Sequence, residues 1–227
     1  MMLVTIAIDG PVSAGKSTLS DAVARRLNIL HLDTGAMYRA VGLAALQNGI
    51  DPHDQEAVER IFLDNKAQVG IEYENERQRT LLNGQDVSQL IRTEEVGLAA
   101  SAVSRYPTVR RYLVDTQRRL SEKTSILMDG RDIGTVVLPH APVKIFLTAS
   151  PEARARRRCL QLKKQGKKAC FDEVLRDLVK RDEQDRGRAA DPLRQADDAV
   201  LLDTSNLDFE QSVRAIMDIV EARYGQK

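Results

Sequence analysis

One short run near the start of the chain, Gly10-Pro11-Val12-Ser13-Ala14-Gly15-Lys16-Ser17-Thr18, constrains the possible folds more than any other segment. An apolar stretch rich in β-branched residues precedes it at 3–8, and a segment with helical spacing of apolar residues follows at 17–27. In that setting, the two glycines let the backbone curl so that successive N–H groups surround an anion. The positive end of the following helix dipole points to the same place. The run therefore predicts a phosphate-binding loop between a buried strand and a helix.

Four further runs, at 29–32, 126–128, 143–147 and 199–202, are also typical of buried parallel strands. Helical segments alternate with them; Asn28 suits the end of the first helix, and Ser150-Pro151-Glu152 the start of a later one. We therefore expect an α/β fold of the P-loop NTPase type, with a parallel five-stranded sheet flanked by helices. Polar or turn signals follow four of the strands, at Asp9-Gly10, Asp33-Thr34-Gly35, Asp129-Gly130 and Asp203-Thr204. Open α/β sheets bind ligands at these carboxyl ends of their strands.

One stretch interrupts the alternation. Val69, Ile71 and Tyr73 alternate with polar residues, and the run at 79–82 meets Asn83-Gly84, a two-residue turn favoured by hairpins. The pattern predicts a small antiparallel β insert at about 66–95, followed by helical sequence to about 120.

The overall charge is balanced but locally uneven. Lys and Arg total 34 against 33 Asp and Glu, which argues against a general nucleic-acid binder. Between 151 and 194, however, 14 basic residues face 8 acidic ones. A locally basic segment of this kind suits a small polyanionic ligand, or it is simply a solvated helix pair.

Other sequence signals narrow the class of protein. The chain has no apolar stretch of about 18 residues, no secretory leader pattern and no metal-type spacing of its 2 cysteines, so we expect a cytoplasmic protein without a membrane partner. The only Asn-Lys pair, Asn65-Lys66, is not followed by the Asp of a guanine-reading NKxD motif. These features favour a small-molecule kinase over a GTPase switch.

The predicted chemistry follows from a few side chains. Lys16 would reach the β- and γ-phosphates of ATP, and the Ser17 hydroxyl would ligate Mg²⁺. Such a kinase must also hold a second anion, and arginines near strand ends, such as Arg39 and Arg131, can grip a phosphate in bidentate fashion. Arg181, Asp185 and Arg188 have the spacing of one helix face, although Gly187 interrupts it. Arg154, Arg157 and Arg158 share a face on the helix begun at Pro151 and suit a lid that excludes water from ATP.

Taken together, these segments make the chain resemble the bacterial cytidylate kinase family. The matching segments are spread over nearly the whole chain: IDGPVSAGKST, LDTGAMYRA, the insert with IRTEEV, PTVR, MDGRDIGTVV, PHAPVKIFL and KRDEQDRGR. The insert and the DGRDIGTVV run are far more specific than the phosphate loop, and adenylate kinases as a family lack so long an insert.

The resemblance implies a single nucleoside monophosphate kinase unit. Its core would comprise 1–37, 124–152 and 195–227, its acceptor-binding insert about 38–123, and its lid and flanking helices about 153–194. It implies transfer of the ATP γ-phosphoryl group to CMP or dCMP, with Mg²⁺. Nothing in the sequence calls for more than a monomer, and the charge balance argues against a nucleic-acid partner.

Residue roles carry over at the matching positions. The resemblance implies ATP binding by Gly10 to Thr18, catalysis by Lys16, Arg131, Arg188 and Arg157, and Mg²⁺ binding by Ser17. It implies an acceptor site that holds the phosphate with Arg39, Arg131 and Arg188, reads cytosine with Ser101, Arg110 and Asp132, binds the pentose with Arg181 and Asp185, and includes Thr34 and Tyr38.

The cytosine assignment is chemically complementary, because the exocyclic amino group of cytosine can donate to Asp132, whereas uracil places a carbonyl there. Two departures from the family pattern are Ser13, where Gly is frequent, and Thr34, where Ser is common. Ser13 would constrain the loop if its position requires a positive φ. A kinase for UMP or another small acceptor, and an ATP-binding regulator without transfer activity, remain alternatives at this stage.

Overall fold

The computed structural model describes residues 3–224, and the chain divides into two compact units. The sheet unit contains the residues up to Leu30 together with those from Ser125 onward. The hairpin unit contains His31–Thr124. The chain passes from the sheet unit into the hairpin unit within strand β2 (Leu30–Asp33).

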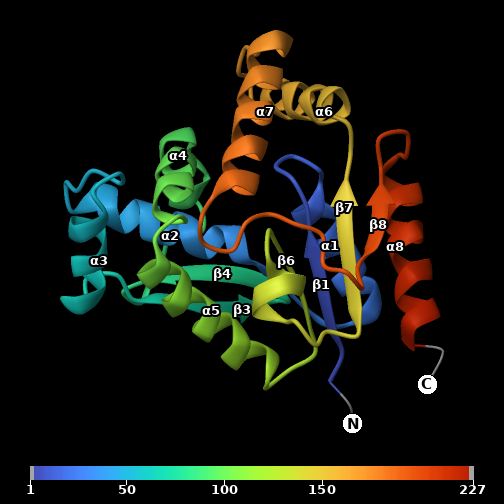
Figure 1. Ribbon diagram of the computed structural model, residues 1–227, viewed down its shortest axis with the longest axis horizontal. Coiled ribbons are helices and arrows are strands. Elements are labelled where there is room, and N and C mark those ends of the chain that lie inside the picture. The colour runs from blue at the N-terminus through green and yellow to red at the C-terminus, as the bar shows by residue number, and fades with distance from the viewer. Residues whose placement is uncertain (1–2, 225–227) are drawn as a thin grey trace. The chain divides into compact units, whose positions relative to one another are not determined.

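The central sheet has five strands in the order β2-β6-β1-β7-β8 (Figure 1). These strands are β1 (Thr5–Asp9), β2, β6 (Ile126–Gly130), β7 (Val143–Thr148) and β8 (Val200–Asp203). β1 pairs in parallel with both β6 and β7, and β7 pairs in parallel with β8. The predicted parallel five-stranded sheet is confirmed, and every strand lies within two residues of its predicted bounds.

Helices α1 (Lys16–Leu27) and α8 (Phe209–Tyr224) pack against the sheet and bury its apolar residues. Asn28 ends α1 in the left-handed conformation (φ 52°, ψ 47°), as its sequence position predicts. The centre of this core consists of large aliphatic side chains from strands and both helices: Ile6, Ile8, Leu19, Val23, Leu127, Ile145, Leu147, Val213 and Ile216. Burying each such side chain contributes on the order of 1.5–3 kcal/mol, so this interface anchors β1, the strand that leads into the phosphate loop.

Helices α6 (Pro151–Lys164) and α7 (Phe171–Gly187) form an adjoining pair in the sheet unit (Figure 1). Ser150 caps α6, because its side-chain oxygen accepts a hydrogen bond from the Ala153 amide at 3.2 Å. The interruption at Gly187 is real: α7 ends there, and Arg188 is extended (φ −68°, ψ 141°). Arg188 therefore does not continue the helical face of Arg181 and Asp185.

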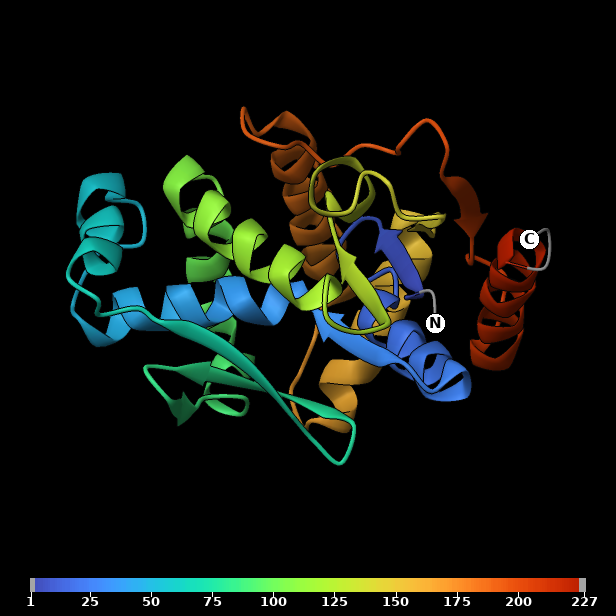
Figure 2. The same cartoon turned by 90° about the horizontal axis from the view of Figure 1, so that it is seen from below.

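The hairpin unit is built around α2 (Thr34–Gln47), which contacts α4 (Glu94–Val103) and the small antiparallel sheet (Figure 2). The remaining elements of this unit are α3 (Gln55–Leu63), β3 (Val69–Glu74), β4 (Arg77–Leu82), β5 (Gln85–Asp86), the 3-10 turn η1 (Leu90–Arg92) and α5 (Pro107–Ser121). The predicted antiparallel insert and the helices after it are thus confirmed. Asp33-Thr34-Gly35, interpreted from sequence as a turn, instead forms the start of α2: Asp33 is the cap, and its Oδ1 accepts from the Ala36 amide at 3.2 Å.

The small antiparallel sheet contains a turn that its amino-acid composition does not predict. Asn83-Gly84 joins β4 to β5 with positive φ at both residues (50° and 79°), as predicted. The longer β3–β4 pair turns at Asn75-Glu76, where φ is 49° and 63°. Sequence reasoning missed this turn because glutamate rarely adopts the left-handed region.

No helix among residues 3–224 is long and apolar enough to cross a membrane.

The end of β1 supplies a stability prediction. A Cβ atom at Gly10, where φ is +152°, would lie 1.9 Å from the carbonyl oxygen of Leu147, so Gly10→Ala must displace a buried strand. The substitution should lower the free energy of unfolding by about 3 kcal/mol or more, measured by urea denaturation. Gly49→Ala is the matched control, because φ is +67° there but no atom lies within 4 Å of the new Cβ. Its cost should be only about 1–2 kcal/mol; equal losses in the two variants would contradict the steric argument.

Candidate active site

The phosphate loop connects the carboxyl end of β1 to α1. Gly15 precedes α1 in the left-handed conformation (φ 93°) and no side chain caps the helix, so the first α1 amides are oriented toward an anion rather than a cap. Ser13 also has a positive φ of 58°. The position where the family frequently has glycine therefore does require a left-handed backbone, and the serine adopts it at some conformational cost.

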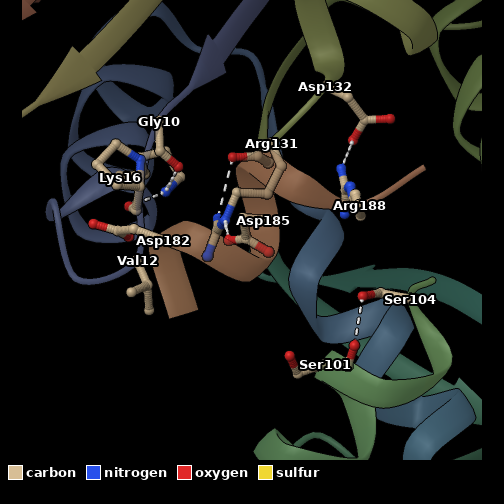
Figure 3. Close-up of polar contacts among 12 residues, drawn as sticks. Gly10, Val12, Lys16, Ser101, Ser104, Arg131, Asp132, Asp182, Asp185 and Arg188 are labelled. Atoms are coloured by element: carbon tan, nitrogen blue, oxygen red, sulfur yellow. Dashed lines mark hydrogen bonds and ion pairs between the residues drawn. The ribbon is translucent and has the colours of Figure 1, made fainter. Parts of the chain in front are cut away.

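Lys16 folds back across the loop (Figure 3). Its Nζ donates to the carbonyl oxygens of Gly10 at 2.7 Å and Pro11 at 2.8 Å. Burial, together with the charge of Arg131, lowers the pKa of Lys16 to about 7. An ammonium has three N–H donors, so the two loop bonds leave a third direction for a phosphate oxygen.

Ser17 brings a hydroxyl beside a carboxylate at the same edge of the sheet. Its Oγ donates to Oδ1 of Asp129, at the end of β6, at 3.1 Å. Hydroxyl and carboxylate oxygens are suitable ligands for Mg²⁺, which proteins commonly hold through one or two such groups plus substrate phosphates. This donor pair fits Mg²⁺ bound jointly with a nucleotide. Asp33, another acid at the end of a strand of the sheet, lies in the hairpin unit, where its Oδ2 is 3.6 Å from Nη1 of Arg92.

Arg131 and Asp132 follow β6, where they pair with residues from the end of α7 (Figure 3). Nε of Arg131 donates to Oδ2 of Asp185 at 2.7 Å, and its Nη1 donates to the Gly130 carbonyl at 3.2 Å. Nη2 of Arg188 lies 3.5 Å from Oδ1 of Asp132, and both side chains are almost fully buried. Burial alone would raise the pKa of Asp185, but the charge and hydrogen bond of Arg131 hold it below its ordinary value.

Arg181 lies one helical turn before Asp185, which places it beside the same cluster. Burial, followed by the charge of Arg131, lowers the pKa of Arg181. The sheet unit therefore gathers five of the predicted acceptor-site residues around the ends of β6 and α7: Arg131, Asp132, Arg181, Asp185 and Arg188.

Asp9, the last residue of β1, is a buried acid that sequence analysis noted only as a turn signal. Its Oδ1 accepts from the Ile133 amide and its Oδ2 from the Gly134 amide, each at 2.7 Å. Burial raises the pKa of Asp9 to about 6, although both amide bonds oppose the shift. The two amides begin a π-helical turn (Ile133–Val137) that the sequence pattern did not indicate.

Two arginines of α6 contact the phosphate loop. Arg154 is buried and donates to the Val12 carbonyl at 3.0 Å, while its Nη2 lies 2.7 Å from Oδ2 of Asp182 on α7. Arg157 donates to Thr204 Oγ1 at 3.2 Å and to the Ala14 carbonyl at 3.4 Å. Sequence reasoning placed both arginines on one face but missed Asp182, because a single acid in a charged helix gives no signal of its burial.

Arg158, the third member of the predicted face, instead donates to the Gln161 side chain at 2.8 Å, in an exposed pair.

The remaining predicted acceptor residues lie in the hairpin unit. Arg110 is buried, with its guanidinium carbon 5.6 Å from the centre of the Tyr38 ring, and its Nη1 donates to the Ser104 carbonyl at 3.1 Å. Ser104 in turn donates to the carbonyl of Ser101 at 3.0 Å (Figure 3). Arg110 therefore lies over Tyr38 and is linked through Ser104 to the main chain at Ser101.

Two further predicted acceptor residues, Arg39 and Thr34, lie on α2. Nη1 of Arg39 donates to the Ile91 carbonyl at 3.2 Å, and a Cβ at Gly97 would lie 3.0 Å from that nitrogen. Thr34 is buried in the first turn of α2. The glycine thus leaves room for a guanidinium that a larger residue would displace.

Comparison with known proteins gives consistent matches across the chain. The family model described as cytidylate kinase matches residues 6–222. A cytidylate kinase of Mycobacterium leprae is 48% identical over 223 residues, covering 98% of this chain and 97% of that protein. A cytidylate kinase of Carboxydothermus hydrogenoformans is 46% identical over 215 residues, covering 95% and 96%.

A solved structure of an uncharacterized protein from Eubacterium ventriosum shares the fold, with a TM-score of 0.54, 11% identity and coverage of 97% and 99%. The family model covers most of the chain, and both relatives match the chain over nearly their whole length. The chain is therefore an enzyme that belongs to the cytidylate kinase family.

Proposed function

We propose that this enzyme transfers the γ-phosphoryl group of ATP to CMP or dCMP, giving ADP and CDP or dCDP. Family membership supports the reaction class, and the names of the relatives support cytidylate as the acceptor. The single observation that carries the proposal is in the sheet unit. There, the carboxyl end of β1 leads into a phosphate loop with Lys16 across it. The carboxyl end of neighbouring β6 leads into Arg131, whose guanidinium is held in place by Asp185.

ATP would bind along Gly10 to Thr18, with its phosphates against the loop amides. Lys16 would neutralise charge that builds up between the β- and γ-phosphates, and no covalent intermediate is needed for in-line transfer. Mg²⁺, held by Ser17 and the ATP phosphates, would screen the remaining negative charge. The Ser17–Asp129 contact supports this assignment, because Asp129 can accept hydrogen bonds from water bound to the metal.

The acceptor would be held by three kinds of contact. Its phosphate would bind Arg39, Arg131 and Arg188, and its pentose would bind Arg181 and Asp185. Its base would be read by Ser101, Arg110 and Asp132, near Thr34 and Tyr38. The paired state of Arg131 and Arg188 supports this role, since a guanidinium already fixed in direction can meet a phosphate with little further ordering.

The predicted domain roles belong to the same proposal. Residues 1–37, 124–152 and 195–227 would form the core, 38–123 the acceptor-binding insert, and 153–194 a lid that carries Arg157. The proposed enzyme acts in the cytoplasm as a monomer on small molecules, without nucleic acid or membrane partners. The near balance of 34 basic and 33 acidic residues supports small-molecule substrates.

A coupled ADP-release assay across CMP, dCMP, UMP, AMP and shikimate, with Mg²⁺ and then with excess chelator, tests the reaction. We expect turnover with CMP and dCMP, little with the others, and none with chelator. Tight ATP binding without ADP release for any acceptor would contradict the proposal and indicate a regulator. A preference for UMP would change the acceptor but not the reaction class.

Lys16→Ala should reduce kcat by about a hundredfold or more, because a charge that stabilises the transferring group is lost. Lys16→Met is the matched variant that preserves side-chain volume, and it should lose as much activity. Circular dichroism and thermal melting should show that both variants remain folded. Activity close to that of the unmodified enzyme in either variant would remove Lys16 from the transfer step.

Asp132→Ala should lower the ratio of kcat/KM for CMP to that for UMP by about 30- to 150-fold. A buried acceptor matched to the cytosine amino group is worth about 2–3 kcal/mol. Asp185→Asn serves as the control, since it loosens Arg131 without altering the proposed base contact. It should raise KM for CMP and UMP alike and leave their ratio near its original value. An unchanged ratio in Asp132→Ala would exclude this residue from base recognition.

A further inference from the structure

Asp9 holds the chain on both sides of Arg131 and Asp132. Its main chain pairs in register with Gly130, the last residue of β6 and the one immediately before Arg131. Its side-chain carboxylate accepts from the amides of Ile133 and Gly134, immediately after Asp132, at 2.7 Å each. A single residue therefore holds the end of β6 and the start of the turn at Ile133, on either side of Arg131 and Asp132.

The contact requires a carboxylate and is tight around the glycine. Asp9 is only 5% exposed, and each of its two oxygens faces one amide. A carboxamide has one oxygen and one NH₂ group, so an asparagine would oppose one amide with another donor. A Cβ at Gly134 would lie 3.3 Å from Oδ2 of Asp9 and 3.2 Å from Cδ of Lys144, which leaves little room for a larger residue.

Lys144 of β7 supports the far end of the same segment. Its stem lies against Gly134, and its Nζ donates to the Pro139 carbonyl at 2.5 Å and to Oδ2 of Asp198 at 2.8 Å. Lys144 is in register with Ala7, two residues before Asp9, so both charged side chains lie on the same face of the sheet. The segment that follows Asp132 thus rests on two buried ionic groups from neighbouring strands.

We propose that Asp9 is a positioning residue for acceptor recognition: through the Ile133 and Gly134 amides it fixes the directions of Arg131 and Asp132, and thereby the preference for cytosine. This inference rests on the proposed function. Asp9 touches no substrate in this scheme. Its effect is geometric, and a displacement of about 1 Å in a recognition group can cost on the order of a hundredfold in rate.

Asp9→Asn tests the proposal, because it retains the size of the side chain and loses one of the two amide contacts. We expect KM for CMP to rise about tenfold or more and the CMP-to-UMP ratio of kcat/KM to fall by about the same factor. KM for ATP should change less than KM for CMP, because the Asp9 carboxylate is hydrogen-bonded to the Ile133 and Gly134 amides and reaches Lys16 only through its charge. Faster hydrogen exchange at the Ile133 and Gly134 amides should accompany these changes.

The control separates positioning from general destabilisation. Val213→Ala removes methyl groups from the α8 side of the core, where Val213 is fully buried, so it should lower the melting temperature without changing either KM or the ratio. If Asp9→Asn behaves in the same way, with both KM values and the ratio unchanged, the proposal is wrong.

Gly134→Ala, which crowds the same contact from the other side, provides a second variant should Asp9→Asn fail to fold. It should lower the CMP-to-UMP ratio, and an unchanged ratio would overturn the proposal. The proposed function and the positioning role of Asp9 would be contradicted by different results. An unmodified enzyme without CMP kinase activity contradicts the proposed function, whereas a CMP preference retained in both variants contradicts only the role of Asp9.

Discussion

The close approach of β1 and β7 at Gly10 is the constraint on which the ligand edge depends. The carbonyl oxygen of Leu147 lies where a side chain of residue 10 would begin, so the residue that follows β1 must be glycine. That glycine lets the chain turn out of the sheet directly into the loop, and α1 begins at Lys16. Since β1 lies between β6 and β7, the same point also brings Asp129 within reach of Ser17. The course of the phosphate loop and the Ser17–Asp129 contact therefore both depend on one steric contact.

Two cationic side chains hold the carbonyl groups of the phosphate loop, and this shapes the loop for an anion. Lys16 binds the carbonyls of Gly10 and Pro11, and Arg154 binds that of Val12. The C=O and N–H groups of an extended peptide point in opposite directions, so gathering carbonyls on one side favours the presentation of amides on the other. Arg154 is itself held by Asp182, so a buried ion pair joins α6 to α7 and the same guanidinium is hydrogen-bonded to the loop. Removing either partner would leave a buried charge uncompensated.

Local signals in the sequence were enough to predict the sheet, the loop, the insert and the Ser150 cap, because each depends on short apolar runs and on residues with strong turn or cap preferences. The Asn75-Glu76 turn was missed because pairing along β3 and β4 forces a glutamate into a region that it seldom adopts. Asp9 and Asp182 were missed for another reason. Their importance comes from partners more than a dozen residues away in sequence or on another helix, and an acid in isolation does not reveal that it is buried. Whether the predicted site residues have their assigned roles stays a prediction.

The paired arginines explain how a site can be charged and still ordered before its substrate arrives. A free arginine side chain has about 2 kcal/mol of rotamer entropy to lose when it is fixed. Arg131 has already lost much of that freedom, because its Nε is bound to Asp185 and its Nη1 to the Gly130 carbonyl. If Arg131 holds the acceptor phosphate as proposed, its ordering cost is already met on folding, and the paired carboxylate also limits repulsion from nearby Lys16 and Arg181. In that proposal, the acid at this edge would favour binding of an anion, although it carries the same sign of charge.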